Sequence, residues 1–265
     1  MKWMLTYIFM AVILFPYGAV AQSCNSASNC NSKGTKLYAQ GKFVQAIKYF
    51  EKQADLATGK EDEKNLKTAL NNLALANLKM GNILLANAWI QEAKELYADD
   101  KATLFNYELI EKEIKKTNIP SSITGTYSRY AGYGRWSTLK IVELKNGILK
   151  IELYLQRFGL VESAEESGPA AYWELSADGF FAENNLTIKY QGIDEKECAI
   201  RMKREDDIKI EAPRQNLTER CEIGGYNTYV HGTYWRTSAK KPLIQKNRKY
   251  NKSNTADRSP LGCSG

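Results

Sequence analysis

Few residues of this chain have the types and spacing that catalysis or metal binding needs. His231 is the one histidine, so a Ser–His–Asp or Cys–His arrangement would have to use it, and no Gly-x-Ser-x-Gly nucleophile motif is present. Its place directly before Gly232, near an expected strand end, favours a structural histidine with a backbone partner. The short ligand spacings of a zinc site are also absent.

Two other patterns that suggest chemistry have simpler explanations. Glu165 and Glu166 could act as a carboxylate pair, but they lie in VESAEESGP, which is typical of a solvated polar loop. Gly132 and Gly134 resemble a phosphate-binding loop in spacing, yet they lie between expected strands rather than before a helix. We therefore predict that the chain is not an enzyme and uses no cofactor or metal.

The segment YSRYAGYGRW is the best candidate for binding another protein. Tyr, Trp and Arg dominate interface hot spots, and a glycine-hinged loop would present them at the mouth of a β-domain. The predicted partner-binding residues are Tyr127, Arg129, Tyr130, Tyr133, Arg135 and Trp136. The alternative is that Tyr127 and Trp136 are core residues, which we expect for at least one of them. A helical face with Asn71, Asn77 and Tyr38 is the second candidate surface.

The first 21 residues have the three-part pattern of a secretory signal peptide. An apolar run follows Lys2, and Ala19-Val20-Ala21 supplies the small residues of a cleavage site. The run is shorter than the roughly 20 residues of a membrane span. We expect cleavage after this site, a periplasmic location and no transmembrane segment in the mature chain. An uncleaved anchor and lipid attachment at Cys24 are the alternatives, and the residues before Cys24 fit lipid attachment poorly.

The formal net charge of +7 is concentrated at the C-terminus. From Arg236 onward the chain has eight basic residues and one acidic residue, so the rest of the mature chain is close to neutral. Residues 237–265 are rich in Ser, Asn and Lys, which predicts a disordered basic tail. Such a tail could contact an anionic surface, whereas nucleic acid is not an expected partner outside the cytoplasm. The alternative is a solvated tail without a partner.

Five cysteines in an exported chain indicate disulfides, and the odd number leaves one cysteine over. Two of them lie in one strand-rich region, which supports their pairing. The expected pairs are Cys198–Cys221 and Cys24–Cys30, with Cys263 remaining. The alternative for the N-terminal pair is that residues 22–33 form a disordered polar leader in which no fixed disulfide forms.

Residues 34–118 are predicted to be helical, because no proline occurs there and apolar residues recur every three or four positions. The segment contains a repeat, in which Gly41 and Ala46 correspond to Gly81 and Ala86 at an offset of 40 residues. It resembles the tetratricopeptide repeat, whose small and apolar positions are matched in the second copy by Leu70, Leu73, Ala74, Gly81, Ala86 and Ala93.

This resemblance implies two helical hairpins followed by a capping helix over residues 101–116. The first copy departs from the family at Gln53, where a small residue is usual. The alternative is an unrelated bundle of helical hairpins.

Residues 121–236 alternate between apolar and polar types with turn signals at short spacing, which predicts an antiparallel β-domain. Asn146-Gly147 between two alternating runs is the strongest hairpin signal. Gly125-Thr-Tyr127 and Gly232-Thr-Tyr234 are expected in the first and last strands of a closed barrel, and an open two-sheet sandwich is the alternative. The other expected strands are 171–176, 186–191, 197–203, 207–213 and 229–236, with a turn at Ala177-Asp178-Gly179.

The last part of this β-domain resembles small periplasmic barrels of the lysozyme-inhibitor-like kind. The shared pattern is a cysteine in an alternating strand, a second strand, a second cysteine followed by glycine, and a closing Gly-x-Tyr. Here these are Cys198, Ile208-Lys-Ile210, Cys221 with Gly224-Gly225, and Gly232-Thr-Tyr234. The resemblance implies a disulfide-clamped barrel that binds another protein, in some cases an enzyme that cleaves peptidoglycan.

Together these expectations describe an α+β multidomain protein, with an N-terminal tetratricopeptide-like helical module and a C-terminal antiparallel β-barrel. The expected function is binding of a cell-wall-degrading enzyme or a secreted toxin, as an inhibitor or an immunity protein. The alternative is a periplasmic scaffold or adaptor that uses the helical repeats in envelope assembly. A carrier of small apolar ligands in the barrel lumen is a third hypothesis.

Overall fold

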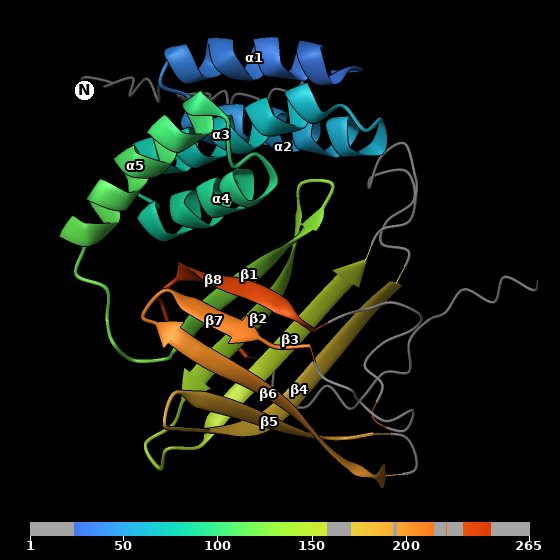
Figure 1. Cartoon of the computed structure of the whole chain (residues 1–265), viewed down its shortest axis with the longest axis vertical. Coiled ribbons are helices and arrows are strands. Elements are labelled where there is room, and N and C mark those ends of the chain that lie inside the picture. The colour runs from blue at the N-terminus through green and yellow to red at the C-terminus, as the bar shows by residue number, and fades with distance from the viewer. Residues whose placement is uncertain (1–23, 158–170, 193–194, 215–220, 222–229, 245–265) are drawn as a thin grey trace, which may run out of the picture.

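The computed structural model describes residues 24–157, 171–192, 195–214, 221 and 230–244, in which five helices precede eight strands (Figure 1). The helices are α1 (Ala27–Ala39), α2 (Phe43–Gly59), α3 (Glu63–Lys79), α4 (Ile83–Leu96) and α5 (Lys101–Lys116). The strands are β1 (Gly125–Gly132), β2 (Arg135–Glu143), β3 (Leu149–Arg157), β4 (Ala171–Ala182), β5 (Asn185–Gln191), β6 (Glu197–Asp206), β7 (Lys209–Ala212) and β8 (Gly232–Ser238). The predicted signal peptide, Glu165, Glu166, Cys263 and most of the predicted tail lie outside the described residues.

The chain becomes helical earlier than the sequence analysis predicted, at Ala27 instead of near Gly34. Ser26 accepts a hydrogen bond from the backbone N–H of Asn29 at 3.2 Å, so its side chain caps the first turn. Residues 27–33 of the predicted polar leader are therefore the first half of this helix. The leader is polar because it contains the N-cap residue and the start of a helix that buries only one of its sides.

Both expected disulfides are present, Cys24–Cys30 and Cys198–Cys221. Cys30 is fully buried in a small apolar cluster with Leu56 and Ala57 of α2. The N-terminal disulfide therefore fastens the residues before α1 to a site where α1 packs on α2.

Two helical hairpins repeat the same turn geometry. Gly41 and Gly81 adopt φ values of 73° and 76°, a region that glycine occupies at little cost. The residue after each glycine donates its backbone N–H to a carbonyl five residues earlier, at 2.9 Å in both turns. α5 then packs on α4 and α3. The helical module thus has two equivalent hairpins and a final helix, as the repeat in the sequence predicted.

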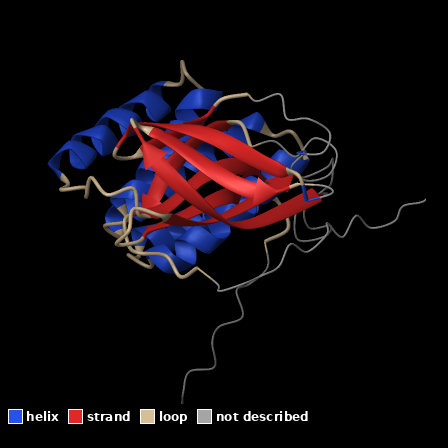
Figure 2. Cartoon of the chain, turned by 90° about the horizontal axis from the view of Figure 1, so that it is seen from below, coloured by secondary structure: helices blue, strands red, loops and turns tan. Residues whose placement is uncertain are grey.

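The eight strands form one closed antiparallel barrel, in which each strand bonds to the next and β8 bonds to β1 (Figure 2). The inward residues of the strands, such as Leu139 and Ile141 of β2, form a single apolar core. Gly125 and Gly232 begin the first and last strands, as expected, and their strands pair to close the barrel. The open sandwich is therefore excluded.

One predicted turn is wrong, because β4 continues through Ala177-Asp178-Gly179 as a regular strand. Gly179 pairs with β3 on one side and with β5 on the other. A Cβ there would lie 2.5 Å from the side chain of Ile151 and 2.8 Å from the carbonyl oxygen of Thr187, so glycine allows close approach of the strands. The turn follows at Glu183-Asn184, both with positive φ.

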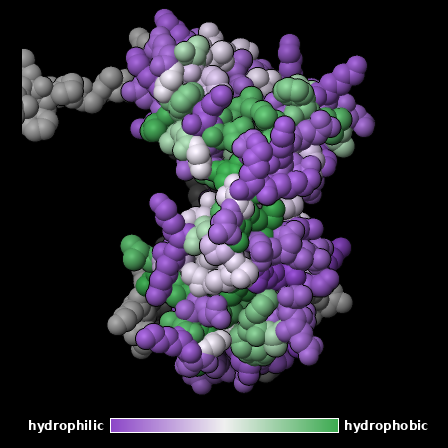
Figure 3. Space-filling view, turned by 90° about the vertical axis from the view of Figure 1, so that its left-hand side faces the viewer, coloured by the Kyte–Doolittle hydropathy of each residue, from purple (hydrophilic) through white to green (hydrophobic). Residues whose placement is uncertain are grey.

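The barrel contacts the helical module mainly through two pairs of elements, α4 with β8 and α2 with β1. α1 lies on the side of the module farthest from the barrel (Figure 1). In the side view of Figure 3 a narrow waist separates the two modules. The contact across this waist involves the segment that the sequence analysis selected for partner binding.

Candidate functional site

The six residues predicted to bind a partner lie on the β1–β2 hairpin, which projects from the barrel onto the helices (Figure 1). Gly132, Tyr133 and Gly134 form its tip, with φ values of 89°, 53° and 68°. A Cβ at Gly134 would lie 2.9 Å from the backbone carbonyl oxygen of Glu51 in α2. The tip therefore approaches α2 so closely that only glycine fits at this position.

Three aromatic rings join the hairpin to α4. Trp89 lies with its ring centroid 4.5 Å from that of Trp136 and 5.8 Å from that of Tyr130, and the two hairpin rings are 5.5 Å apart. All three contacts are edge-to-face, a favourable geometry for aromatic pairs. Tyr130 and Trp136 pack against the same apolar cluster as the core of the helical module. We call Trp89, Tyr130 and Trp136 the aromatic joint.

Most of the residues predicted to bind a partner on this hairpin are buried or half-buried. Tyr127 is fully buried in the barrel, and Tyr133 is buried at the tip. The rings of Tyr130 and Trp136 pack in the aromatic joint. Arg129 is half-buried, and among the six residues only Arg135 is exposed. Tyr127 is therefore a core residue of the barrel, whereas Trp136 is partly buried against the core of the helical module. Aromatic side chains bury area equally well against another protein and against a second module of the same chain.

The sequence analysis did not single out Trp89, the third member of the joint. It lies in ANAWIQEA, where the other buried residues of the helix are mostly small. A single large aromatic side chain among alanines in a repeat is the signal that could have indicated a contact outside the helix stack.

Glu92 on α4 has a strongly shifted pKa. Burial, with a smaller effect from Glu95, raises the pKa of Glu92 to about 7, and Arg129 of β1 opposes the rise. Burial also raises the pKa of the Tyr130 hydroxyl to about 12. The contact between the modules therefore holds a partly buried carboxyl group whose pKa is raised by its surroundings.

His231 lies directly before β8, and its backbone carbonyl accepts a hydrogen bond from Arg129 at 2.9 Å. Burial lowers the pKa of its imidazole, and the cations Arg129 and Arg214 lower it further. Both effects favour the neutral form of the ring. Among the described residues, no three His, Cys, Asp or Glu side chains are grouped so that they could hold a metal ion.

The asparagines predicted to line a helical binding face are used inside the module. Asn71 donates to the hydroxyl of Thr103 at 2.9 Å and accepts from the amide of Asn106 at 2.8 Å, so it bonds α3 to α5. Asn77 donates to a backbone carbonyl one turn earlier in α3. Both amides are buried, which corrects their assignment to a peptide-binding surface. Tyr38 is half-buried.

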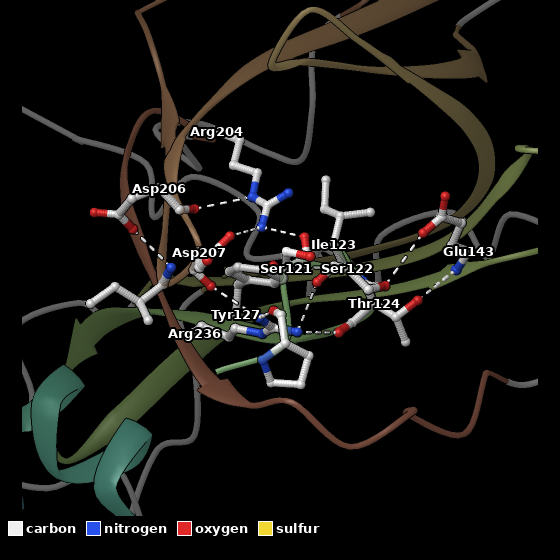
Figure 4. A network of polar contacts seen from close by, with 12 residues as sticks. Ser121, Ser122, Ile123, Thr124, Tyr127, Glu143, Arg204, Asp206, Asp207 and Arg236 are labelled. Atoms are coloured by element: carbon white, nitrogen blue, oxygen red, sulfur yellow. Dashed lines mark hydrogen bonds and ion pairs between the residues drawn. The ribbon is translucent and has the colours of Figure 1, made fainter. Parts of the chain in front are cut away.

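A buried arginine that the sequence analysis did not select fastens the segment between the modules to the barrel (Figure 4). Arg236 of β8 is fully buried, and no carboxylate pairs with it among the described residues. Instead its guanidinium donates to the carbonyls of Pro120, Asp207, Ser122 and Thr124 at 2.7, 3.0, 2.9 and 2.7 Å. Arg204 donates to the neighbouring carbonyl of Ser121 at 2.6 Å. Two arginines thus hold the linker against one end of the barrel.

No protein-family model matches this chain, and no curated protein or solved structure matches it. The chain is therefore not shown to belong to either family that its sequence resembles. Within the described ranges, no helix combines the length and apolar character that crossing a bilayer needs.

Proposed function

We propose that this chain is an exported protein that binds another protein in the periplasm and has no catalytic activity of its own. Export is supported by the signal-peptide pattern of residues 1–21 and by two disulfides, which persist in oxidising compartments. The absence of nucleophile and metal-ligand motifs in the sequence supports binding rather than catalysis. The function favoured by the geometry is that of an adaptor or scaffold.

The observation that carries this proposal is the placement of the barrel on the helical module. The barrel packs mainly on α2 and α4, whereas α1 and α3 contact each other in the layer beyond them. The parts of α2 and α4 that lie under the barrel cannot receive a partner while the aromatic joint is closed. We therefore assign partner binding to the outer surface of α1 and α3, which we call the α1–α3 face.

The α1–α3 face has polar groups that suit a polypeptide partner. Asn72 of α3 donates to the side-chain oxygen of Asn31 in α1 at 3.0 Å, and both side chains are partly exposed. An amide group makes up to four hydrogen bonds, so this pair keeps donors and acceptors for a partner's backbone. Thr68 lies one turn before Asn72 on α3 and is also partly exposed.

Inhibition of a wall-degrading enzyme, or immunity against such a toxin, is the second candidate, and the outer wall of the barrel favours it. Tyr154 and Tyr172 lie side by side there, with ring centroids 6.3 Å apart. Tyr172 is 38% exposed, and Phe180 on the outer side of the same strand is 45% exposed. Exposed aromatic residues of this kind are typical of interface hot spots.

Point variants distinguish the two proposed functions. They are preferred to deletion of the helical module, because deletion would expose the aromatic joint and favour aggregation. Thr68→Arg places a large charge on the α1–α3 face, and Tyr172→Ala removes an aromatic ring from the barrel wall. Wild-type chain and both variants are used to capture partners from periplasmic extract and from supernatants of competing strains, with mass spectrometry and a wall-hydrolase assay as readouts.

If the chain is an adaptor, wild type and Tyr172→Ala should capture an envelope protein in stoichiometric amounts. Thr68→Arg should no longer capture it. If wild type and Thr68→Arg inhibit a wall hydrolase and Tyr172→Ala does not, the inhibitor function is established instead. Capture that neither variant changes would refute both surface assignments.

A further inference from the structure

The last helix of the module has an outer face that points away from the rest of the chain. The side of α5 that packs on α3 and α4 buries Thr103, Asn106 and Ile110. Lys101, Phe105, Glu108 and Lys112 follow the i, i+4, i+7, i+11 spacing of one helix side, and all four are exposed. With the neighbouring Leu109 we call these residues the α5 face.

Apolar exposure is concentrated at the centre of the α5 face. Phe105 is 68% exposed and Leu109, one turn later, is 38% exposed. Figure 3 views the molecule from the side on which α5 lies, and apolar residues there are surrounded by hydrophilic ones. These two adjacent apolar side chains form a small exposed patch within a polar rim.

The charges around Phe105 have an order that changes sign at every position when it is reversed. Asp99 and Lys101 precede Phe105 by six and four residues, and Glu108 and Lys112 follow it by three and seven. The signs along the chain are negative, positive, Phe105, negative, positive. Within the described part of the chain, none of these four charged side chains forms an ion pair or hydrogen bond. Reversal of the order places each charge opposite one of the other sign.

We propose that the α5 face binds the α5 face of a second copy of this chain, in an antiparallel dimer whose two-fold axis passes near Phe105. In that register Lys101 lies level with the partner's Glu108, and Asp99, directly before the N-cap Asp100, lies within two residues of the partner's Lys112. The two-fold axis forms each pair twice, so four ion pairs flank a centre made by Phe105 and Leu109 of both copies. Antiparallel α5 helices also align their dipoles favourably.

The test is a charge swap, read by sedimentation velocity of the purified chain over a range of concentrations at low salt. Wild type is expected to be a reversible mixture of monomer and dimer. Lys101→Glu and Glu108→Lys each make two ion pairs repulsive, so each should weaken the dimer by about tenfold or more. The double variant Lys101→Glu/Glu108→Lys restores opposite charges and should return the dissociation constant to within about threefold of wild type.

Two further variants decide whether this face forms the contact. Phe105→Glu should give only monomer, whereas Val44→Glu, at a 59% exposed apolar residue of α2, should leave the dimer intact. The proposal is overturned if wild type is monomeric at every concentration, if Phe105→Glu still dimerises, or if the double variant is no stronger than the single ones. If wild type forms no dimer but binds a different protein that Phe105→Glu does not bind, the face belongs to an interface with that protein. This result would also overturn the proposal.

Discussion

Arg236 lies over the ring of Tyr127, with its guanidinium carbon 5.8 Å from the ring centroid, and the two residues face each other across the β1–β8 pair. Arg129 lies over Tyr234 at the same distance. Each tyrosine hydroxyl donates to the carbonyl of the residue four positions earlier, at 3.1 Å in β1 and 3.0 Å in β8. Two Gly-Thr-Tyr-x-Arg segments therefore close the barrel by making equivalent contacts in opposite directions.

This local two-fold arrangement predicts that Tyr127→Phe and Tyr234→Phe have similar effects. Each change leaves one buried carbonyl without its hydroxyl donor, so each should lower the free energy of unfolding by about 1 kcal/mol. Urea denaturation followed by fluorescence measures the loss. Tyr154→Phe, on the outer wall of the barrel, is the matched control and should change stability little. Strongly unequal effects at Tyr127 and Tyr234 would contradict the equivalence.

Arg236→Met should be among the most destabilising single changes in the barrel. Methionine fills the same space but leaves the linker carbonyls of Ser122 and Thr124 without donors, so we expect a loss of about 3 kcal/mol or more. Thermal unfolding provides the measurement. Lys203→Met removes an exposed cation that pairs with Glu205 on β6, and it should cost less than about 1 kcal/mol. Equal effects of the two changes would refute the role of the buried guanidinium.

Gly134→Ala should open the contact between the modules. The added Cβ would lie 2.9 Å from the carbonyl oxygen of Glu51 and would push the hairpin tip off α2. The near-ultraviolet circular dichroism of the Trp89–Trp136 pair should then weaken, and stability should fall. Gly147→Ala has a similar positive φ of 77° but no atom within 4 Å of the added Cβ, so it isolates the backbone strain.

The strain alone should cost about 1 kcal/mol at Gly147. Gly134→Ala should cost roughly 1–2 kcal/mol more, because the clash adds to the strain. A near-ultraviolet signal that stays unchanged in Gly134→Ala would show that the tip does not hold the aromatic joint closed.

Glu92→Gln should stabilise the chain at alkaline pH and have little effect in acid. The folded state raises the pKa of Glu92 from 4.5 to about 7, so the folded state binds this proton more tightly than the unfolded state does. The stabilising effect of the protonated carboxyl is complete below the unfolded pKa near 4.5 and is lost as the pH rises through about 7. Chemical denaturation of both forms at pH 5 and pH 8 measures the difference, which should be larger at pH 8.

Glu63→Gln, on the exposed first turn of α3, is the control for this experiment. Its effect should be small and nearly the same at both pH values. A stability difference between wild type and Glu92→Gln that does not grow with pH would contradict the burial of Glu92 at the joint.

The sequence predicted the elements better than their contacts. Alternation around Asn146-Gly147 located the β2–β3 hairpin, and the two Gly-Thr-Tyr segments indicated the strands that close the barrel. The start of α1 was missed because a polar composition conceals a capped helix that buries few residues. Gly179 was taken for a turn residue because Asp-Gly suits a turn, whereas the strand uses the missing side chain for close packing.

The candidate site could not be predicted from residue types alone. A Tyr, Trp and Arg cluster has the same composition whether it binds another protein or packs on the chain's own helices. Only the tertiary arrangement brings Trp89 within 4.5 Å of Trp136 and shows which use this hairpin serves. The role of Arg236 likewise depends on the linker carbonyls of residues 120–124, which no side-chain pattern in the sequence reveals.

The proposed function is tested most directly by site-specific photo-crosslinking in living cells, with a photoreactive residue at Thr68 on the α1–α3 face. The account predicts one cross-linked adduct with another envelope protein from position 68, and none from position 172 on the barrel wall. An adduct that forms only from position 172, or no adduct from either position, would contradict the assignment of partner binding to the helical module.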